Sequence, residues 1–483
     1  MHIDLPQDVD NIIGKLESAG YEAYAVGGCV RDSVLGREPD DWDITTSATP
    51  SQIKEIFRRT VDTGIQHGTV TVLMHGTGYE VTTYRIDGIY EDARHPKEVS
   101  FTDDLTKDLE RRDFTINAMA YNKTRGLVDV FDGIGDLDRR LIRCVGDPNE
   151  RFSEDALRMM RAVRFAAQLG YDIDEATASA IRDKADTLSK VSAERIMTEL
   201  TKLIMSDNPD MLRNCYELGL TAVFLPEFDE CMNTPQNIKH HCYNVGEHIL
   251  HTMKAVRAEN IPESSVIKLD NTDHMQDDPA IEDDKTGLTT KESMVGDDKS
   301  KRILRFTMML HDIAKPRVVT VDENGIFHNK GHAALGATLS REILHRLKAD
   351  NELIHAVCML VEHHDWRFEA DKRSIRRAIN KMGYDLFPLL IEVQRADIEG
   401  QSDYKREEKL ARLDVIETLY KEILADKDAV TIKDLAVNGK DLIEHGVAAG
   451  PELGEILNRM LDHVIDHPED NVKDVLLGMF VSG

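Results

Sequence analysis

Segments that would carry a chain into or across a membrane are missing from this sequence of 483 residues. No apolar run approaches the roughly 20 residues that a helix needs to span a bilayer. The polar stretch 1–4 does not resemble the start of a signal peptide. The six cysteines are scattered and form no Cys-x-x-Cys pair, which argues against a zinc knuckle or a disulfide framework. We therefore expect a cytoplasmic protein with no membrane partner.

Positive charge is also scarce. The chain has 60 Lys and Arg against 88 Asp and Glu, and its formal net charge is −28. Part of the excess lies in residues 259–300, where 12 acidic residues stand against 4 lysines. Their polar, acidic composition predicts a disordered insertion. Tight binding of a nucleic acid over the whole surface is unlikely at this charge, so any such contact is expected on local basic stripes.

A glycine pair near the N-terminus gives the first sign of a functional site. The stretch 23–26 predicts a short strand that ends at Gly27 and Gly28, and a short helix follows up to Gly36. Because glycine has no side chain, backbone amides can approach a phosphate here, and the positive end of the helix points to the same place.

Two acidic residues follow the glycine pair. Asp41 and Asp43 precede Ile44 in what we expect to be a second strand. A spacing of two puts both carboxylates on one face of a strand. They repel each other unless a divalent cation lies between them, and Mg²⁺ prefers carboxylate oxygens together with substrate phosphate.

The stretch Gly27-Gly28-Cys29-Val30-Arg31-Asp32, followed by Asp41-Trp42-Asp43, resembles the signature of class II nucleotidyltransferases. This family contains the CCA-adding tRNA nucleotidyltransferases and the bacterial poly(A) polymerases. The resemblance implies that Asp41 and Asp43 hold catalytic Mg²⁺ and that Gly28 and Arg31 contact a nucleotide. Glu80 lies on the second strand of a hairpin predicted over 69–84. It is a candidate third catalytic acid, or else a solvated strand residue.

Residues 110–120 match the second motif of the same family. The resemblance implies that Arg111, Arg112, Asp113 and Asn117 contact the triphosphate and ribose, in keeping with the forked hydrogen bonds of arginine to phosphate. An ordinary surface helix start is the alternative. The preceding stretch 85–104 is expected to be a mobile loop and resembles the flexible loop between the first two motifs of CCA-adding enzymes. Its Arg94-His95-Pro96 implies, through that resemblance, an enzyme able to add A.

A helix is predicted to start at Ser153 as its N-cap and to continue beyond Phe165. Its Glu-Asp-x-x-Arg resembles the motif with which the family selects bases without a template, which assigns base reading to Asp155 and Arg158. Arg161 and Arg164 are predicted on the same side and are also assigned to nucleotide binding. The alternative is an amphipathic helix with solvated ion pairs. Arg195 and Glu199 resemble the residues that brace this region.

Histidines become frequent in residues 235–400, and their order resembles that of a His-Asp (HD) metal-dependent phosphohydrolase domain. The resemblance implies a metal site made by His241, His311, Asp312 and Asp397, with further stations at Gly331-His332 and Glu362-His363-His364-Asp365. Imidazole and carboxylate ligands suit Mn²⁺, Ni²⁺, Fe or Zn²⁺ and can activate a water molecule. Alternatively, the domain keeps the fold as an RNA-binding body with poor activity.

Together these features predict an α+β protein: a mixed α/β nucleotidyltransferase head (1–147), a helical neck for nucleotide selection and RNA binding (148–230), a helical HD body (231–402) and a helical tail that binds tRNA (403–483). The expected function is CCA addition to tRNA from CTP and ATP, with a possible HD phosphohydrolase activity. The alternatives are a poly(A) polymerase, and an HD phosphohydrolase with a non-catalytic head.

Overall fold

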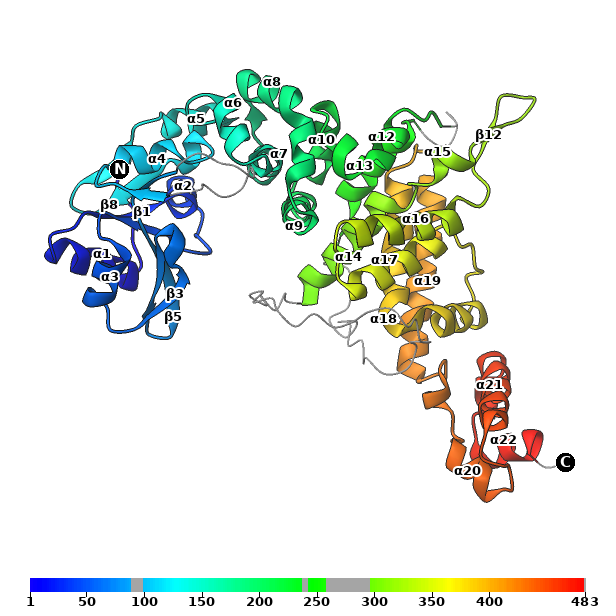
Figure 1. The fold of residues 1–483 in the computed structure, drawn as a ribbon. Helices are drawn as coiled ribbons and strands as arrows, with labels where there is room; N and C mark the ends of the chain where they lie inside the picture. Colours follow the sequence, from blue (N-terminus) through cyan, green and yellow to red (C-terminus); the bar gives the residue numbers. More distant parts are fainter. Residues whose placement is uncertain (88–98, 237–241, 258–295, 482–483) are drawn as a thin grey trace. The chain divides into compact units, whose positions relative to one another are not determined.

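The computed structural model describes residues 1–87, 99–236, 242–257 and 296–481 (Figure 1). They form two compact units, Met1–Pro226 and Glu227–Gly483. The first unit contains a seven-stranded sheet followed by helices, and the second is almost entirely helical, so the predicted α+β class is confirmed. The finer division into head, neck, body and tail stays a prediction.

The sheet of the first unit has the strand order β3-β4-β5-β2-β1-β8-β9. Its neighbouring strands are antiparallel except for β2 and β5. Helix α1 (Gln7–Ser18) buries an apolar face made by Val9, Ile12, Ile13 and Leu16, and α3 (Pro50–Ile56) follows β2. The strands are β1 (Ala23–Val26), β2 (Ile44–Thr46), β3 (Thr60–Gly64), β4 (Thr69–Met74), β5 (Thr77–Thr83), β8 (Met119–Asn122) and β9 (Gly126–Asp129).

The parallel pairing of β2 with β5 sets Ile44 opposite Val81, so the residues just before them, Asp43 and Glu80, lie next to each other. The prediction that Asp41 and Asp43 lie within a strand is wrong, because β2 begins only at Ile44. Pairing nevertheless reaches one residue further back, since the Val26 amide donates to the Asp43 carbonyl at 3.0 Å. The predicted hairpin β4–β5 is confirmed.

Two segments predicted to be irregular are partly regular. Within 85–104, β6 (Arg85–Asp87) pairs with β7 (Val99–Phe101), so the loop prediction is wrong at its ends. Arg94-His95-Pro96 lies outside the described residues. The predicted insertion 259–300 is too long, because α14 (Gly296–Leu310) starts inside it. Ser300 is buried there, which fixes this turn against the rest of the unit; residues 259–295 lie outside the described part.

The helix predicted from Ser153 is also wrong, because the chain forms two helices here, α6 (Pro148–Glu154) and α7 (Leu157–Leu169). Ser153 lies inside α6 and donates to the Asn149 carbonyl at 2.7 Å instead of capping. Asp155 breaks the run, since its backbone is extended and its carboxylate accepts from the Leu157 amide at 3.0 Å. The first unit continues with α8 (Glu175–Lys184), α9 (Ala193–Ile204), α10 (Leu212–Glu217) and α11 (Thr221–Phe224).

The second unit is a helical bundle followed by a small helical subdomain with a core of its own. Arg376 ties the two together, donating from Nε to the Ile465 carbonyl at 2.7 Å and from Nη1 to Asp428 at 2.8 Å. No helix in the described ranges is long and apolar enough to cross a membrane. The main helices are α13 (Val245–Ala255), α14, α16 (His332–Arg346), α17 (Asn351–His363), α18 (Lys372–Glu399), α19 (Arg406–Asp426), α20 (Gly439–Glu444), α21 (Pro451–Asp466) and α22 (Lys473–Phe480).

Candidate active site and metal centre

Three predicted acids come together where β2 begins beside the parallel strand β5. Asp41 and Asp43 arrive from the loop before β2, and Glu80 from β5. Desolvation, and then the negative charges of Asp41 and Glu80, raise the pKa of the Asp43 carboxyl to about 6, although Arg112 partly offsets them. All three side chains remain exposed to solvent. A carboxylate cluster that repels itself but stays accessible fits a divalent cation such as Mg²⁺.

We expect the affinity of this cluster for Mg²⁺ to depend on pH. The pKa of Asp43 in the folded protein lies above its ordinary value, so its ionisation opposes folding as the pH rises toward 6. A cation removes that repulsion but must displace the proton. Affinity should therefore rise by about tenfold per pH unit below pH 6 and level off above it. Calorimetric titration with Mg²⁺ at pH 5 to 8 measures this affinity, with the heat of the Asp43→Asn variant subtracted. An affinity that does not change with pH would contradict the prediction.

The turn between β1 and α2 (Gly28–Val34) needs glycine. Gly27 has φ +85°, and a Cβ placed there would lie 3.0 Å from Nη1 of Arg112. Beside it, Arg31 donates to both oxygens of Asp32 at 2.9 and 2.7 Å and to Asn117 at 2.7 Å. The two predicted motifs, separated by some 80 residues of sequence, therefore meet at one turn.

Asp108, which the sequence analysis did not select, connects the arginine motif to the acid cluster. It is fully buried on α4 (Leu105–Glu110) and accepts two hydrogen bonds from Arg111, at 2.9 and 2.8 Å. It also accepts from Thr45 of β2 at 3.0 Å, and Arg112 lies 3.6 Å away. Despite burial, Arg111 and Arg112 hold its pKa below the ordinary range. The sequence does contain a signal for this residue. Asp108 precedes Arg111 by three residues and Arg112 by four, the spacings at which side chains meet along a helix.

Asp113 and Asn117 also form part of a buried network. The Asp113 carboxylate accepts from Arg161 at 2.8 Å and from Asn117 at 3.2 Å. Burial alone would raise the pKa of Asp113, but Arg161 and Arg158 hold it well below its ordinary value. Of these two predicted nucleotide contacts, Asp113 serves here as an anchor for Arg161, and Asn117 as the link between Arg31 and Asp113.

The side chains of Asp155 and Arg158 do not pair with each other in the contacts that the structure records, although the Arg158 amide donates to the Asp155 carbonyl at 3.0 Å. Asp155 accepts from Arg195 at 2.7 Å, while Arg158 forms an ion pair with Glu154 and donates to the Arg111 carbonyl at 2.9 Å. Arg158 thus lies against the second motif, and its role in base reading stays a prediction. Asp155 is held by the helix that was expected to brace the neck.

Arg164, also predicted to bind nucleotide, is a buried neighbour of this site. Its Nε lies 2.9 Å from Glu199 of α9, and the guanidinium carbon lies 3.9 Å from the centroid of the Phe165 ring. Desolvation lowers the pKa of Arg164 to about 10, although Glu199 acts in the opposite direction. Arg164 of α7 thus forms a buried ion pair with Glu199 of α9.

We expect Glu199→Ala to lower the free energy of unfolding by about 3–5 kcal/mol, because it leaves the Arg164 guanidinium buried without its carboxylate. The matched control is Glu175→Ala, which removes an ion pair to Arg182 that is 3.2 Å long but exposed. That change should cost less than about 1 kcal/mol. Urea unfolding of both variants checks this, and equal small losses would show that the buried pair is not a structural support.

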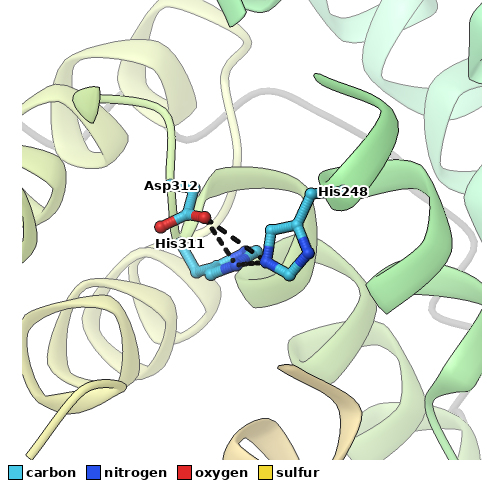
Figure 2. A group of neighbouring side chains, drawn as sticks. All are labelled: His248, His311 and Asp312. Carbon is cyan, nitrogen blue, oxygen red and sulfur yellow. Dashed lines mark hydrogen bonds and ion pairs between the residues drawn. The ribbon is translucent and has the colours of Figure 1, made fainter. Parts of the chain in front are cut away.

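The second unit contains a buried cluster of histidines and aspartates (Figure 2). His248 comes from α13, and His311 and Asp312 follow directly after α14. Asp312 Oδ2 lies 3.4 Å from His248 Nε2 and 3.2 Å from His311 Nε2, and the two Nε2 atoms are 3.3 Å apart. Asp397 of α18 completes this side, with Oδ1 2.9 Å from His248 and 3.7 Å from His311.

The other oxygen of Asp312 faces a second pair of histidines. Oδ1 lies 3.6 Å from His332 Nε2 and 3.7 Å from His364 Nε2, and those two nitrogens are 3.1 Å apart. Each set has three donor atoms within 4.8 Å of one another, the first being His248, His311 and Asp312 and the second Asp312, His332 and His364. Asp312 thus belongs to two candidate metal triads.

Hydrogen bonds to backbone carbonyls leave the Nε2 atoms of these histidines directed into the cluster. The Nδ1 atoms of His311, His332 and His364 bond to carbonyls of Met308, Asn329 and Val361 at 2.8, 2.8 and 2.7 Å. Such partners orient metal-ligating imidazoles. Burial alone would lower the pKa of His311, but Asp312 and then Asp397 raise it to about 10. The pKa values of Asp312 and Asp397 lie well below their ordinary value, although burial acts in the opposite direction, because histidines contact both carboxylates. Burial and then His311 lower the pKa of His364 to about 4. A cation would take the place of the His311 proton.

Of the predicted ligands in this cluster, the structure brings together His311, Asp312 and Asp397. His241 lies outside the described residues. His248, which the sequence analysis passed over, provides the imidazole from this part of the chain. Its signal was present in the predicted stretch, since Asn244 caps α13 and places His248 one turn into that helix.

Comparisons with known proteins identify the family of the chain. Residues 23–143 match the family described as "Poly A polymerase head domain", residues 170–232 "Probable RNA and SrmB- binding site of polymerase A", and residues 332–480 "tRNA nucleotidyltransferase domain 2". Together with the acid cluster on its mixed sheet, these matches define a protein of the nucleotidyltransferase class with a head of the poly(A) polymerase type.

Similar proteins narrow the class. The crystal structure of the Bacillus stearothermophilus CCA-adding enzyme in complex with CTP has a TM-score of 0.64 and 30% identity, covering 96% of this chain and 93% of that one. The chain therefore belongs to the CCA-adding enzyme and poly(A) polymerase family. The Thermotoga maritima CCA-adding enzyme complexed with tRNA, at 17% identity, has a TM-score of 0.57 over the full length of both chains, which shows the shared fold.

Curated relatives are more similar over a shorter stretch. CCA-adding enzymes of Limosilactobacillus reuteri and Lactiplantibacillus plantarum are 57% and 54% identical over 198 residues. Each match covers 41% of this chain and 49% of the relative, so the chain aligns with about half the length of these proteins.

Proposed function

We propose that this protein adds C, C and A to the 3′ end of tRNA from CTP and ATP, in the cytoplasm, with Mg²⁺ as cofactor. One observation carries the proposal: Asp41, Asp43 and Glu80 converge, exposed to solvent, where β2 begins beside β5. The names of its relatives support the choice of reaction. In this reaction the RNA 3′-hydroxyl attacks the α-phosphate, and pyrophosphate leaves.

Asp41 and Asp43 would hold the Mg²⁺, with Glu80 beside them. Bound Mg²⁺ would lower the pKa of the attacking hydroxyl and stabilise negative charge on the phosphate. Arg112 is the arginine best placed to turn toward a triphosphate. It lies over the Gly27–Gly28 turn, and its contact to Asp108, at 3.6 Å, is longer than the hydrogen bonds that hold Arg31 and Arg111. Those two would position the surrounding backbone.

We assign base selection to Asp155 and Arg158. CTP and ATP each present an amino group beside a ring-nitrogen acceptor, whereas UTP and GTP present a carbonyl beside an N–H. A carboxylate and a guanidinium match the first pattern, and leaving them unpaired against the second costs on the order of 1–3 kcal/mol per group. This role requires Asp155 to exchange its hydrogen bond with Arg195 for one with the base.

The decisive experiment is incubation with tRNA that lacks its 3′ CCA, with CTP and ATP supplied singly and together. Addition of two C residues with CTP alone, and of a single A only after them, supports the proposal. A long run of A residues from ATP alone would instead identify a poly(A) polymerase. The absence of any addition would favour a protein whose head is not catalytic.

We propose a metal-dependent phosphohydrolase as a second function, because Asp312 belongs to two donor triads in one buried cluster. His248, His311, His332 and His364, with Asp312 and Asp397, would hold transition metals such as Mn²⁺ or Ni²⁺, which would supply an activated water. Lys315 lies beside them, with Nζ 2.6 Å from Asp312 and 3.0 Å from Gln236. It would stabilise negative charge at the cluster.

A further inference from the structure

A small pocket in the second unit is lined by three cations and by no acidic residue. Arg367, Lys409 and Arg412 surround it together with Trp366, Gln394 and apolar side chains. Its volume is about 50 Å³. On this measure one water molecule needs roughly 10–15 Å³, so the pocket has room for a group of several oxygens but not for a nucleobase.

The charge of this pocket is poorly compensated within the protein. The recorded hydrogen bond of Lys409 is to the neutral side-chain oxygen of Gln401, at 2.8 Å. Arg412 donates to the Phe368 carbonyl, its nearest recorded carboxylate is the exposed Glu369 at 3.9 Å, and Arg367 is itself exposed. Burial lowers the pKa of Lys409, and repulsion by Arg367 and Arg406 lowers it further although Asp397 opposes this. In a chain with 88 acids against 60 bases, such a concentration of positive charge is unusual.

The pocket is linked to the histidine–aspartate cluster by hydrogen bonds. The Trp366 amide donates to the His363 carbonyl at 3.0 Å, and the Gln394 side chain donates to the Trp366 carbonyl at 2.9 Å. Gln401 bridges the two sites, because it donates to Asp397 at 2.8 Å and accepts from Lys409 at 2.8 Å.

We propose that this pocket binds one phosphate of an RNA backbone. Arginine and lysine donors suit a phosphate, and the one carboxylate recorded in an ion pair with those that line the pocket, Glu369, lies 3.9 Å from Arg412, beyond hydrogen-bond distance. The half-buried indole of Trp366 lines the pocket, and Nζ of Lys381 lies 5.1 Å from the centroid of its ring. An aromatic ring among cations is the combination by which proteins hold single-stranded RNA. The inference rests on the proposed function in one respect, namely that RNA is the polymer this protein handles. Free phosphate or pyrophosphate has the same chemistry and is the competing ligand.

The test measures RNA binding by the full-length protein without nucleotides, using fluorescence anisotropy of a labelled RNA hairpin with a single-stranded 3′ end. The variants are Arg367→Ala and Arg367→Ala/Lys409→Met. The control, Arg341→Ala, removes an exposed arginine of α16 that does not line the pocket. The double variant should raise Kd by about tenfold at 0.1 M salt and lower the salt dependence by about one to two ion equivalents. The control should change neither value.

A second arm titrates inorganic phosphate and pyrophosphate by calorimetry. If these ions bind the parent, are lost from the double variant, and RNA binding is unchanged, the pocket holds a free anion and the RNA proposal is overturned. Unchanged Kd and salt dependence in the variants overturn it as well. If the double variant does not fold because of Lys409→Met, the Kd and salt dependence of the exposed single variant Arg367→Ala decide whether the pocket binds RNA. A parent that binds RNA but adds no nucleotide would overturn the proposed CCA addition and leave this inference intact.

Discussion

Asp43→Asn is expected to lower CTP incorporation into tRNA without its CCA by at least about 10³-fold while leaving the fold unchanged. Asp43 lies where β2 starts, beside Glu80, and desolvation and then the charges of Asp41 and Glu80 raise its pKa to about 6. Removing one charge relieves that repulsion, so stability should be equal or greater. Catalysis should fail because the remaining acids cannot hold the cation that activates the hydroxyl. Primer extension with all four nucleotides should show the same loss for each.

Asp40→Asn is the matched control, since Asp40 is an exposed aspartate one residue before Asp41. It should retain activity within about twofold, as expected for a surface substitution of this kind. Near-parental incorporation by Asp43→Asn, or an equal loss in both variants, would remove the assignment of the metal site.

Much of the head could be predicted from sequence because its signals are local. The spacing of Val9, Ile12 and Leu16 predicts α1, and alternation around a glycine turn predicts the hairpin β4–β5. Two errors concern where regular elements begin and end. Asp155 ends α6, and its side chain competes for a backbone donor, as its bond to the Leu157 amide shows, whereas β2 simply starts one residue after Asp43.

The candidate sites were less complete, because their missing members are set by tertiary packing. Asp108 has no motif of its own, and its role becomes visible only when β2 and the arginine pair meet around it. His248 was one of several histidines in a single stretch, and only the fold directs it toward His311. In contrast, Asp41, Asp43 and the His311-Asp312 doublet could be found because their partners lie one or two residues away.

Asp312→Asn is expected to remove all metal from the second unit and abolish metal-dependent phosphohydrolase activity, while CCA addition stays within about twofold of the parent. Asp312 has one oxygen toward His248 and His311 and the other toward His332 and His364, so both triads lose a ligand. An amide keeps the shape but loses the charge that a cation needs. Elemental analysis of the purified protein, with hydrolysis of bis-p-nitrophenyl phosphate in the presence of Mn²⁺ as the activity, measures both effects.

His364→Gln separates the two triads, and His363→Gln is its matched control. His364 belongs to the second triad, whereas its buried neighbour His363 bonds to the Met359 carbonyl at 2.9 Å and packs against Trp366, outside both. His364→Gln should therefore lose about one metal equivalent of two and most of the hydrolysis, and His363→Gln neither. Retention of full metal content by Asp312→Asn would show that the cluster is a buried ion-pair network with a structural role. Loss of CCA addition in a variant that keeps its circular dichroism spectrum would show that the two sites are coupled.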